Sequence, residues 1–184
     1  MTALRDELLA GRTIGLSGRR RAASVRDRLI MLGAGVLDLD WPDSLDDQQV
    51  LDWVRARGPL GAVVHDGRTS FGDGGHAGLT AVLDDAWRAV AAIANAALIQ
   101  SGEGGKVILI GPLAGAGEYA GAARSALENL ARTLSVEWAR YGITSAAIWP
   151  GQTSSEDDLA ELVAFLVSPA GDYYSGCRFV LGAV

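Results

Sequence analysis

The histidines and serines of this chain are the side chains best suited to acid–base or nucleophilic chemistry. His65 and His76 are its two histidines, and Asp66 follows the first of them. Their spacing matches no metal-ligand motif, so we expect structural roles for both and no metal site. The serines considered as nucleophiles are Ser17, Ser101 and Ser125. None has a histidine and an acid at recognisable positions, which leaves a hydrolase triad without support.

Three consecutive arginines, Arg19, Arg20 and Arg21, follow Ser17 and Gly18 in an expected turn. Their charges could clamp a phosphate, such as a 2′-phosphate or a phosphate of coenzyme A. They could instead form a solvated, charged turn on an acidic protein. Runs of like charge are usually solvated faces, so we favour the second interpretation.

The composition indicates one globular domain, residues 1–184, with 49% hydrophobic and 21% charged residues. A formal net charge of −6 disfavours a nucleic-acid partner, which requires clustered positive charge. The single cysteine, Cys177, excludes an internal disulfide framework and zinc sites built on several cysteines. Residues 1–10 carry charges, and no segment has the roughly 18 apolar residues of a membrane span. We therefore expect a cytoplasmic protein without a membrane partner.

Apolar segments that fit strands alternate along the chain with amphipathic segments that fit helices. The expected strands are residues 12–16, 35–39, 60–65, 107–110, 144–148 and 178–181. The expected helices are residues 23–32, 46–57 and 120–140, one from Leu79 or Thr80 to Gln100, and one from Ser155 or Glu156 to Leu166. Asp43 or Ser44 is the expected cap of the second helix, and residues 69–78 are an expected glycine-rich loop. This alternation predicts an α/β fold, a doubly wound parallel sheet with helices on both faces.

Residues 105–151 have the most specific pattern, a buried strand, a long amphipathic helix and a second strand ending in Pro150 and Gly151. Together with the ending DLAELVAFLVSPAGDYYSGCRFVLGA, this order resembles the catalytic half of the short-chain dehydrogenase/reductase (SDR) family. GRTIGLSG, LGAGVLDLD and LGAVVHDG resemble the family's N-terminal half more loosely. The resemblance covers nearly the whole chain and implies a Rossmann-like domain, shortened relative to the family.

The residues that carry catalysis in the family are missing at the matching positions. The family has a serine after the first of these strands, a Tyr-x-x-x-Lys pair opening the long helix, and an asparagine on the preceding helix. The matching positions here are Pro112, Ala120, Arg124 and Ala94. No Tyr-x-x-x-Lys exists in any register, because the one lysine is Lys106 and Gly102 stands four residues before it. Arg124 is no simple substitute, since its guanidinium stays protonated and has a different geometry.

The cofactor loop of the family is also degenerate. Its Thr-Gly-x-x-x-Gly-x-Gly pattern lets the backbone approach a pyrophosphate, but the loop here retains Gly18 alone, and Ala22 and Ser24 add side chains. The chain is shorter than the family at residues 33–43, 115–124 and 153–157, which removes ligand-binding parts and keeps the scaffold. The resemblance thus implies that this chain binds no cofactor itself and that NAD(P) is held by an active partner.

The two long helices, residues 83–100 and 120–140, are retained, and in the family this pair packs against the same pair of a neighbouring subunit. We expect one stripe of each helix to face the sheet, formed by Trp87, Val90, Ala91, Ala94, Leu98, Leu127, Leu130, Leu134 and Trp138. The residues expected at the subunit interface are Ala89, Ala92, Ala96, Ala122, Ala126, Asn129 and Thr133. A helix that is apolar on two sides is buried on two sides. The alternative is an alanine-rich surface, because alanine favours any helix.

These observations predict a non-catalytic SDR-fold subunit, a pseudoenzyme. It would pair with an active SDR chain in a heterodimer or heterotetramer, an NAD(P)-dependent oxidoreductase complex acting on a hydroxy or keto substrate such as an acyl thioester. A homodimer is compatible with the same face. One alternative is a small module that binds a phosphate-bearing ligand, a nucleotide or coenzyme A. Another is a divergent NAD(P)-dependent reductase that uses Tyr119 or Tyr141.

Overall fold

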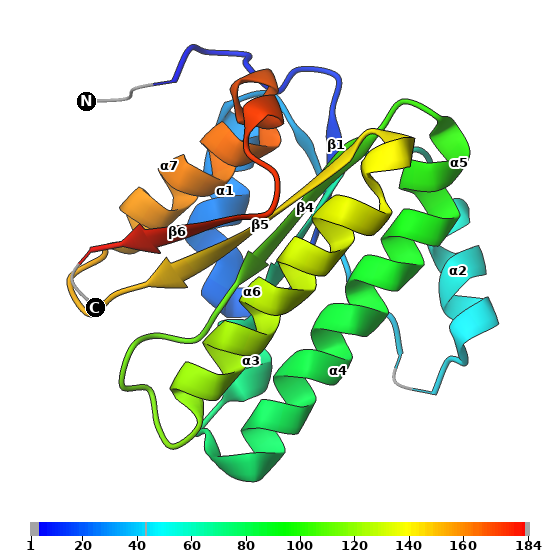
Figure 1. The fold of residues 1–184 in the computed structure, drawn as a ribbon. Helices are drawn as coiled ribbons and strands as arrows, with labels where there is room; N and C mark the ends of the chain where they lie inside the picture. The colour runs from blue at the N-terminus through cyan, green and yellow to red at the C-terminus, as the bar shows by residue number, and fades with distance from the viewer. Residues whose placement is uncertain (1–3, 43, 183–184) are drawn as a thin grey trace.

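A parallel sheet forms the centre of the molecule (Figure 1), which in this computed structural model is described for residues 4–42 and 44–182. Within these residues the sheet has six strands in the order β2-β1-β3-β4-β5-β6, and each neighbouring pair is parallel. The strands are β1 (Thr13–Leu16), β2 (Gly35–Asp38), β3 (Ala62–Asp66), β4 (Gly105–Ile110), β5 (Ile143–Pro150) and β6 (Cys177–Leu181). The predicted doubly wound parallel sheet is confirmed.

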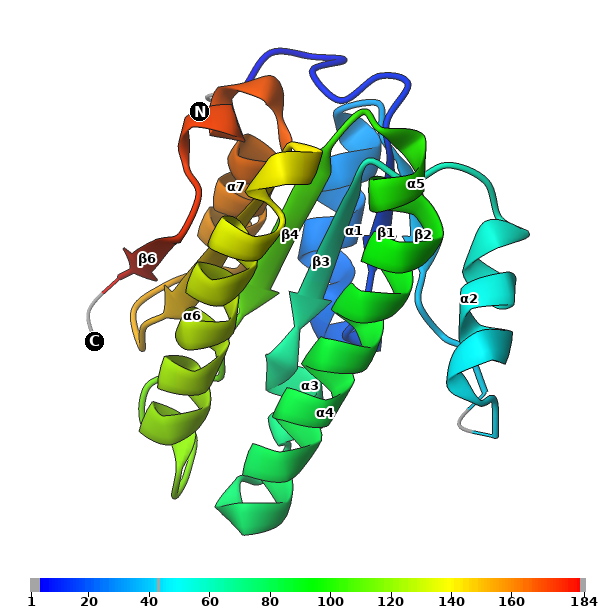
Figure 2. The same cartoon turned by 45° about the vertical axis from the view of Figure 1, so that its right-hand side comes forward.

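Helices cover both faces of this sheet (Figure 2). The helices are α1 (Ala23–Met31), α2 (Asp47–Arg55), α3 (Gly67–Phe71), α4 (Gly75–Ile93), α5 (Ile99–Ser101), α6 (Ala120–Glu137) and α7 (Glu156–Val167). α1 and α7 pack on one face, α4 and α6 lie side by side on the other, and α2 packs beside α4. Along the described ranges, no helix has both the length and the apolar character needed to cross a membrane.

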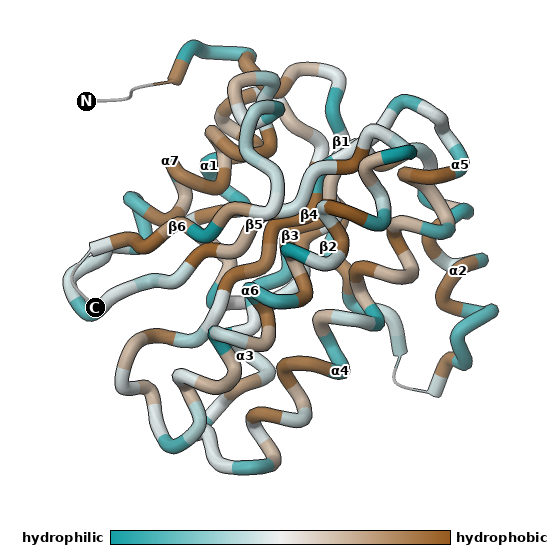
Figure 3. The backbone as a smooth tube through the Cα atoms, viewed as in Figure 1, coloured by the Kyte–Doolittle hydropathy of each residue, from teal (hydrophilic) through white to brown (hydrophobic). Residues whose placement is uncertain are grey.

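The central strands are apolar because helices exclude water from both of their faces. All of β3 is buried, and β4 is buried from Lys106 to Ile110. Continuous runs of valine, isoleucine and leucine suit a parallel sheet between two helix layers, and Figure 3 shows the hydrophobic colours gathered along β4. Lys106, whose side chain would be a lone buried charge here, forms an ion pair with Asp172.

The segment after β3 departs from the loop predicted at residues 69–78. It forms the short helix α3, and α4 then begins at Gly75, earlier than predicted. A Cβ on Gly78 would lie 2.3 Å from the carbonyl oxygen of Phe71, so a glycine lets α4 start close against α3. At its other end α4 passes through a π-helical turn, Ala94–Leu98, into α5.

The cap of α2 is Asp46, and the prediction of Ser44 is wrong, while Asp43 lies outside the described residues. The Asp46 carboxylate accepts from the backbone N–H of Gln49 at 2.8 Å, and the Gln49 side chain accepts from the Asp46 N–H at 3.0 Å. This reciprocal pair satisfies two backbone donors that the start of a helix leaves open.

The orientation predicted for α4 is wrong for its small residues. Ala89, Ala92 and Ala96 are buried in the chain's own core, whereas Trp87, predicted to face the sheet, is 53% exposed. The reason is that α2 packs against α4 and the π-helical turn, and so covers a side of α4 that the sequence pattern leaves open. These three alanines are therefore unavailable to a partner.

α6 has the predicted orientation. Leu127 and Leu134 are buried against the sheet. The residues predicted for its outer side, Ala122, Ala126, Asn129 and Thr133, are exposed or half-buried. Val136 continues this side and is 76% exposed. The outer surface of the helix pair, called here the α4–α6 face, consists of Trp87 and Ala91 from α4 and of Ala122, Ala126, Asn129, Thr133 and Val136 from α6.

We predict that Asp46→Ala lowers the free energy of unfolding by about 1 kcal/mol, because the start of α2 loses its reciprocal cap. Urea denaturation followed by circular dichroism measures this change. Asp52→Ala is the control, since Asp52 makes exposed contacts with Gln48 and Arg55 and should cost less than about 0.5 kcal/mol. Equal losses in the two variants would contradict the capping role.

Candidate functional site

The carboxyl ends of β1 and β3 form the crevice of the sheet. The chain runs outward from β1 to β2 and then returns past β1 to β3, so the connections after β1 and β3 diverge here. In open α/β sheets, ligands bind at this switch point. A cavity of about 390 Å³ lies at this place, between the strand ends and α4. Its polar and aromatic lining includes Ser17, Asp40, Trp41, His65, Asp85 and Arg88.

Ser17 and His65 form a hydrogen-bonded pair in this cavity, with 2.8 Å between Ser17 Oγ and His65 Nδ1. His65 is 3% exposed, and its Nε2 has no hydrogen-bond partner among the described residues. Burial lowers the pKa of His65 from 6.5 to about 4, so the imidazole is neutral at pH 7. A histidine with so low a pKa holds Ser17 in place but is a weak base for activating a hydroxyl at neutral pH.

A buried ion network lies on the other face of the sheet at the same crevice. Arg68, which is 4% exposed, donates through Nε and Nη2 to the two oxygens of Asp66 at 2.9 and 2.6 Å. It donates through Nη1 and Nη2 to Glu156 at 2.6 and 3.0 Å, and through Nη2 to the carbonyl of Arg21 at 3.0 Å. Burial by itself would lower the pKa of Arg68, but the hydrogen bonds and charges of Asp66 and Glu156 outweigh it and raise that pKa. One guanidinium thus joins α3, the turn after β1 and the start of α7.

The turn after β1 packs against Asp66 and α3. A Cβ on Gly18 would lie 2.5 Å from the Cβ of Asp66, so the backbone there requires glycine. The hydroxyl of Thr69 donates to the Gly18 carbonyl at 2.7 Å. Ala22 is fully buried, and Ser24 follows it in α1. The turn therefore lacks the side-chain-free backbone on which a dinucleotide pyrophosphate rests.

Arg124 and Trp149 pack together at the carboxyl ends of β4 and β5. Arg124, which is 4% exposed, donates through Nη2 to the carbonyl of Pro150 at 3.2 Å. Its guanidinium lies 4.8 Å from the ring centroid of Trp149, and Trp149 Nε1 donates to the Arg124 carbonyl at 3.1 Å. Burial, followed by the like charge of Arg178, lowers the pKa of Arg124.

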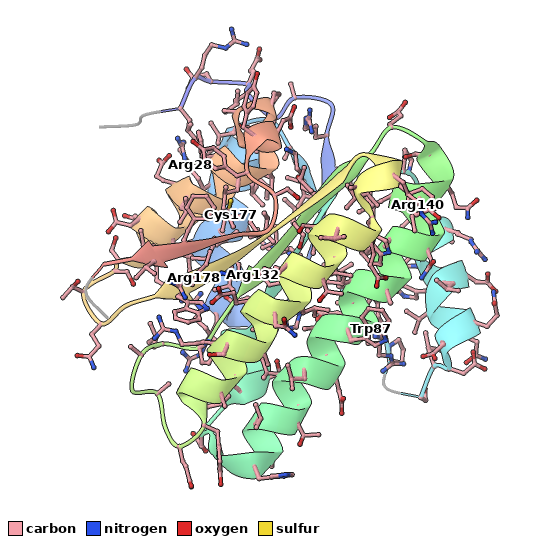
Figure 4. The ribbon with its side chains drawn as sticks, viewed as in Figure 1. Arg28, Trp87, Arg132, Arg140, Cys177 and Arg178 are labelled. Atoms are coloured by element: carbon pink, nitrogen blue, oxygen red, sulfur yellow. The ribbon has the colours of Figure 1, made fainter. Side chains whose placement is uncertain are left out.

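Two further arginines, Arg178 and Arg132, lie between β6 and α6 (Figure 4). Arg178 of β6 lies 4.4 Å from the Trp149 centroid and forms an ion pair with Glu128 at 3.0 Å. Arg132 forms a second ion pair with the same carboxylate at 2.6 Å. The region between α6, β5 and β6 therefore holds three arginines around one glutamate and one indole ring.

The remaining positions matched to the family's catalytic residues carry no ionisable side chain. Pro112 follows β4 and is buried, Ala120 is the first residue of α6, and Ala94 is buried in the π-helical turn. Asn95, next to Ala94, is exposed and donates to the Ala91 carbonyl at 2.9 Å.

The two candidate tyrosines lie at opposite ends of α6. Tyr119 stands just before the helix at the carboxyl edge of the sheet and is 43% exposed. Tyr141 follows the last turn, which an 18-residue helix places about 27 Å away. Tyr141 therefore cannot serve a site at the crevice, and the prediction that it could is wrong.

The two histidines do not come together. His65 is buried in β3, whereas His76 is exposed in the first turn of α4. Across the part of the chain that the structure describes, no three His, Cys, Asp or Glu side chains are grouped so that they could hold a metal ion.

Solved structures resemble this arrangement over nearly its whole length. Citronellol catabolism dehydrogenase of Pseudomonas aeruginosa matches with a TM-score of 0.74 and 22% identity, covering 98% of this chain and 97% of that one. A doubly substituted short-chain dehydrogenase/reductase of Serratia marcescens matches with 0.74 and 23%, covering 95% and 97%. A hydroxysteroid dehydrogenase of Escherichia coli matches with 0.76 and 16%, covering 97% and 99%. The chain has the SDR fold.

No family model matches the sequence, and no curated protein is similar to it. The SDR fold here is built with a single strand, β2, between α1 and α2, as the short segment 33–43 predicted. At these identities the likeness concerns the fold, so the chemistry of the crevice has to be read from this chain's own residues.

Several residues of the crevice and of the region between α6, β5 and β6 were not predicted from the sequence. They are Arg68, Glu156, Trp149, Arg178, Glu128 and the pairing of Ser17 with His65. Arg68 and Glu156 are 88 residues apart, and Ser17 and His65 are 48 apart. Local spacing carries no signal at such separations. A buried strand followed by acidic and basic residues could have pointed to Asp66 and Arg68, but not to their partner.

We predict that stability falls as the pH is lowered from about 6.5 to about 4, because the unfolded chain protonates His65 in this window and the folded chain does not. The full effect is on the order of 3 kcal/mol. Urea denaturation at a series of pH values measures it. His65→Asn keeps a polar atom near Ser17 and should flatten this dependence, whereas His76→Asn at the exposed histidine should leave it unchanged. A pH dependence that survives in His65→Asn would contradict the assignment.

Proposed function

We propose that this protein is a non-catalytic SDR-fold subunit that pairs through its α4–α6 face with an active SDR chain. The complex would be an NAD(P)-dependent oxidoreductase acting on a hydroxy or keto substrate, with an acyl thioester as the specific substrate class. The active chain would hold NAD(P) and supply the serine, tyrosine and lysine. This chain would stabilise and shape its partner.

The observation that carries this proposal is the state of Arg124. At the position of the family's lysine, this guanidinium is buried, donates to the Pro150 carbonyl and lies against Trp149. A planar guanidinium fixed in this way cannot act as the mobile ammonium that lowers the pKa of a neighbouring tyrosine. Ala120, where that tyrosine would stand, offers no proton.

The turn after β1 supports the absence of a cofactor on this chain. Arg68 holds the Arg21 carbonyl, and Gly18 lies against Asp66. These contacts fix the backbone of the turn, and Ala22 and Ser24 add side chains where the family's loop has glycine. The geometry of this turn favours NAD(P) binding by the partner alone.

The α4–α6 face supports the pairing. Trp87 and Val136 are large apolar side chains with 53% and 76% exposure, and small residues between them allow close helix contact. A groove of about 360 Å³ between α2 and α4 borders Trp87 and includes Val50 and Ala91. Aromatic anchors beside apolar pockets are typical of interface centres.

A second candidate function is a small module that binds a phosphate-bearing ligand. A cavity of about 320 Å³ beside α3 is lined by Arg21 and Arg68 together with Asp73, which is the observation that favours it. A thermal shift with ATP or coenzyme A that Arg21→Gln removes would support this function.

Co-expression with the genomic neighbours, affinity purification and native mass spectrometry test the main proposal. We expect a stoichiometric complex with a chain that carries Tyr-x-x-x-Lys, and NAD(P)-dependent turnover by that complex. Recovery of this chain alone, as a monomer or homodimer, would overturn the proposal. Turnover by the isolated chain would overturn it as well.

We predict that Val136→Glu weakens this complex at least tenfold, because a charge buried in an apolar contact remains unpaired. Surface plasmon resonance with the purified partner measures the dissociation constant. Met31→Glu is the matched control, since Met31 is 72% exposed on α1, on the opposite face of the sheet. Equal affinities for the two variants would place the contact elsewhere.

A further inference from the structure

The arginines around Trp149 contain more positive charge than their neighbours balance. This cluster, called here the Trp149 cluster, consists of Arg124, Arg132, Arg178, Glu128 and the indole itself. Glu128 is the carboxylate to which both Arg132 and Arg178 are paired. The cluster thus holds three guanidinium groups and one carboxylate, which pairs with two of them.

Arg124 is the least satisfied member of the Trp149 cluster. It is 4% exposed and donates through Nη2 to the carbonyl of Pro150, a neutral acceptor, at 3.2 Å. Its Nε is buried and finds no hydrogen-bond partner anywhere in residues 4–42 and 44–182. A buried charge without an ionic partner is costly, so such a group is normally paired in the functional state.

Arg178 is a second positively charged side chain beside Trp149. Both guanidinium groups pack against the Trp149 ring, at 4.8 Å for Arg124 and 4.4 Å for Arg178. Their mutual repulsion is part of the reason why the pKa of Arg124 is lowered. An anion near both would remove this repulsion and give Arg124 the partner that it lacks.

The Trp149 cluster also lies where a ligand can reach it. Trp149 is half-buried near the carboxyl end of β5, and the Arg178 side chain is 40% exposed on the neighbouring edge strand β6. Figure 4 shows Arg178 and Arg132 between β6 and α6. Trp149 is near the carboxyl end of its strand, and ligands of open α/β sheets bind beyond the carboxyl ends of strands.

We propose that Arg124 and Arg178 bind a small oxyanion, the carboxylate or phosphate group of a metabolite, beside Trp149. The planar guanidinium offers paired N–H donors that match the two oxygens of such a group. Arg178 guides the anion from solvent, Arg124 receives it in the interior, and the indole ring forms the apolar wall. This site is separate from the α4–α6 face and does not depend on the proposed pairing.

Titration of the purified full-length chain with inorganic phosphate and, separately, with sodium acetate tests this site. Isothermal titration calorimetry at constant ionic strength, set with sodium chloride, measures the affinity. Fluorescence of the five tryptophans, compared with that of Trp149→Phe, measures the response of Trp149. We expect saturable binding of at least one of the two anions with a change in fluorescence. Tighter binding of acetate assigns a carboxylate ligand, and tighter binding of phosphate assigns a phosphate ligand.

The variants separate this site from a general effect of positive charge. Arg178→Gln should weaken anion binding at least tenfold. Arg132→Gln is the control, because it also removes one of the two positive charges that are paired with Glu128. Arg132 is 60% exposed and makes no cation–π contact with Trp149 among the described residues, so this variant should weaken binding less than twofold. Trp149→Phe should retain binding and lose the fluorescence change. The exposed position of Arg178 lets its variant fold even where Arg124→Gln does not.

Absence of saturable binding of either anion to the unmodified chain would overturn the proposal. Equal weakening of anion binding by Arg132→Gln and Arg178→Gln would overturn it too. That result would show that the anion responds to the general positive charge of this region and not to a specific site.

Discussion

The buried guanidinium of Arg68 is the interaction on which the centre of this molecule depends. A charge in the interior has to be paired, and Arg68 is paired with Asp66 at the end of β3 and with Glu156 at the start of α7. The same group holds the backbone of the turn after β1. Elements from three separate parts of the chain are therefore fixed to one another at the switch point of the sheet, beside the crevice.

The scaffold of this fold and the side chains at the ends of its strands obey different constraints. The sheet requires apolar strands and two helix layers, and it makes no demand on the side chains at the carboxyl ends of its strands. The residues at those ends can therefore vary without loss of the fold. In this protein they include side chains that contact other parts of the same chain. Arg124 lies against Trp149, and His65 is a neutral partner of Ser17. The fold and the function of its edge are thus separate properties.

The α4–α6 face shows why the position of one neighbouring helix matters for an interface. α4 is apolar on more than one side, and α2 covers one of these sides. Trp87 and Val136 remain outside, although tryptophan and valine usually belong to a core. Exposed large apolar residues next to small ones form the surface through which we propose that the protein pairs.

The alternation of apolar strands and amphipathic helices is a local property of the sequence, and it was sufficient to predict the parallel sheet, the shortened region around β2 and the outward side of α6. Local spacing also excluded a Tyr-x-x-x-Lys pair, because one lysine with Gly102 before it settles that question in any register. The outward side of α4 was decided by α2. The cap of α2, Asp46 with Gln49, is a local contact between residues three apart, so it could have been predicted from the sequence. The side chains at the crevice are brought together by contacts between distant parts of the chain. Ser17 and His65 are 48 residues apart, and Arg68 and Glu156 are 88 residues apart. Periodicity reports which side of an element avoids water, but it holds no information about which distant side chain will lie there, and that is the physical reason why only the tertiary structure could determine the site.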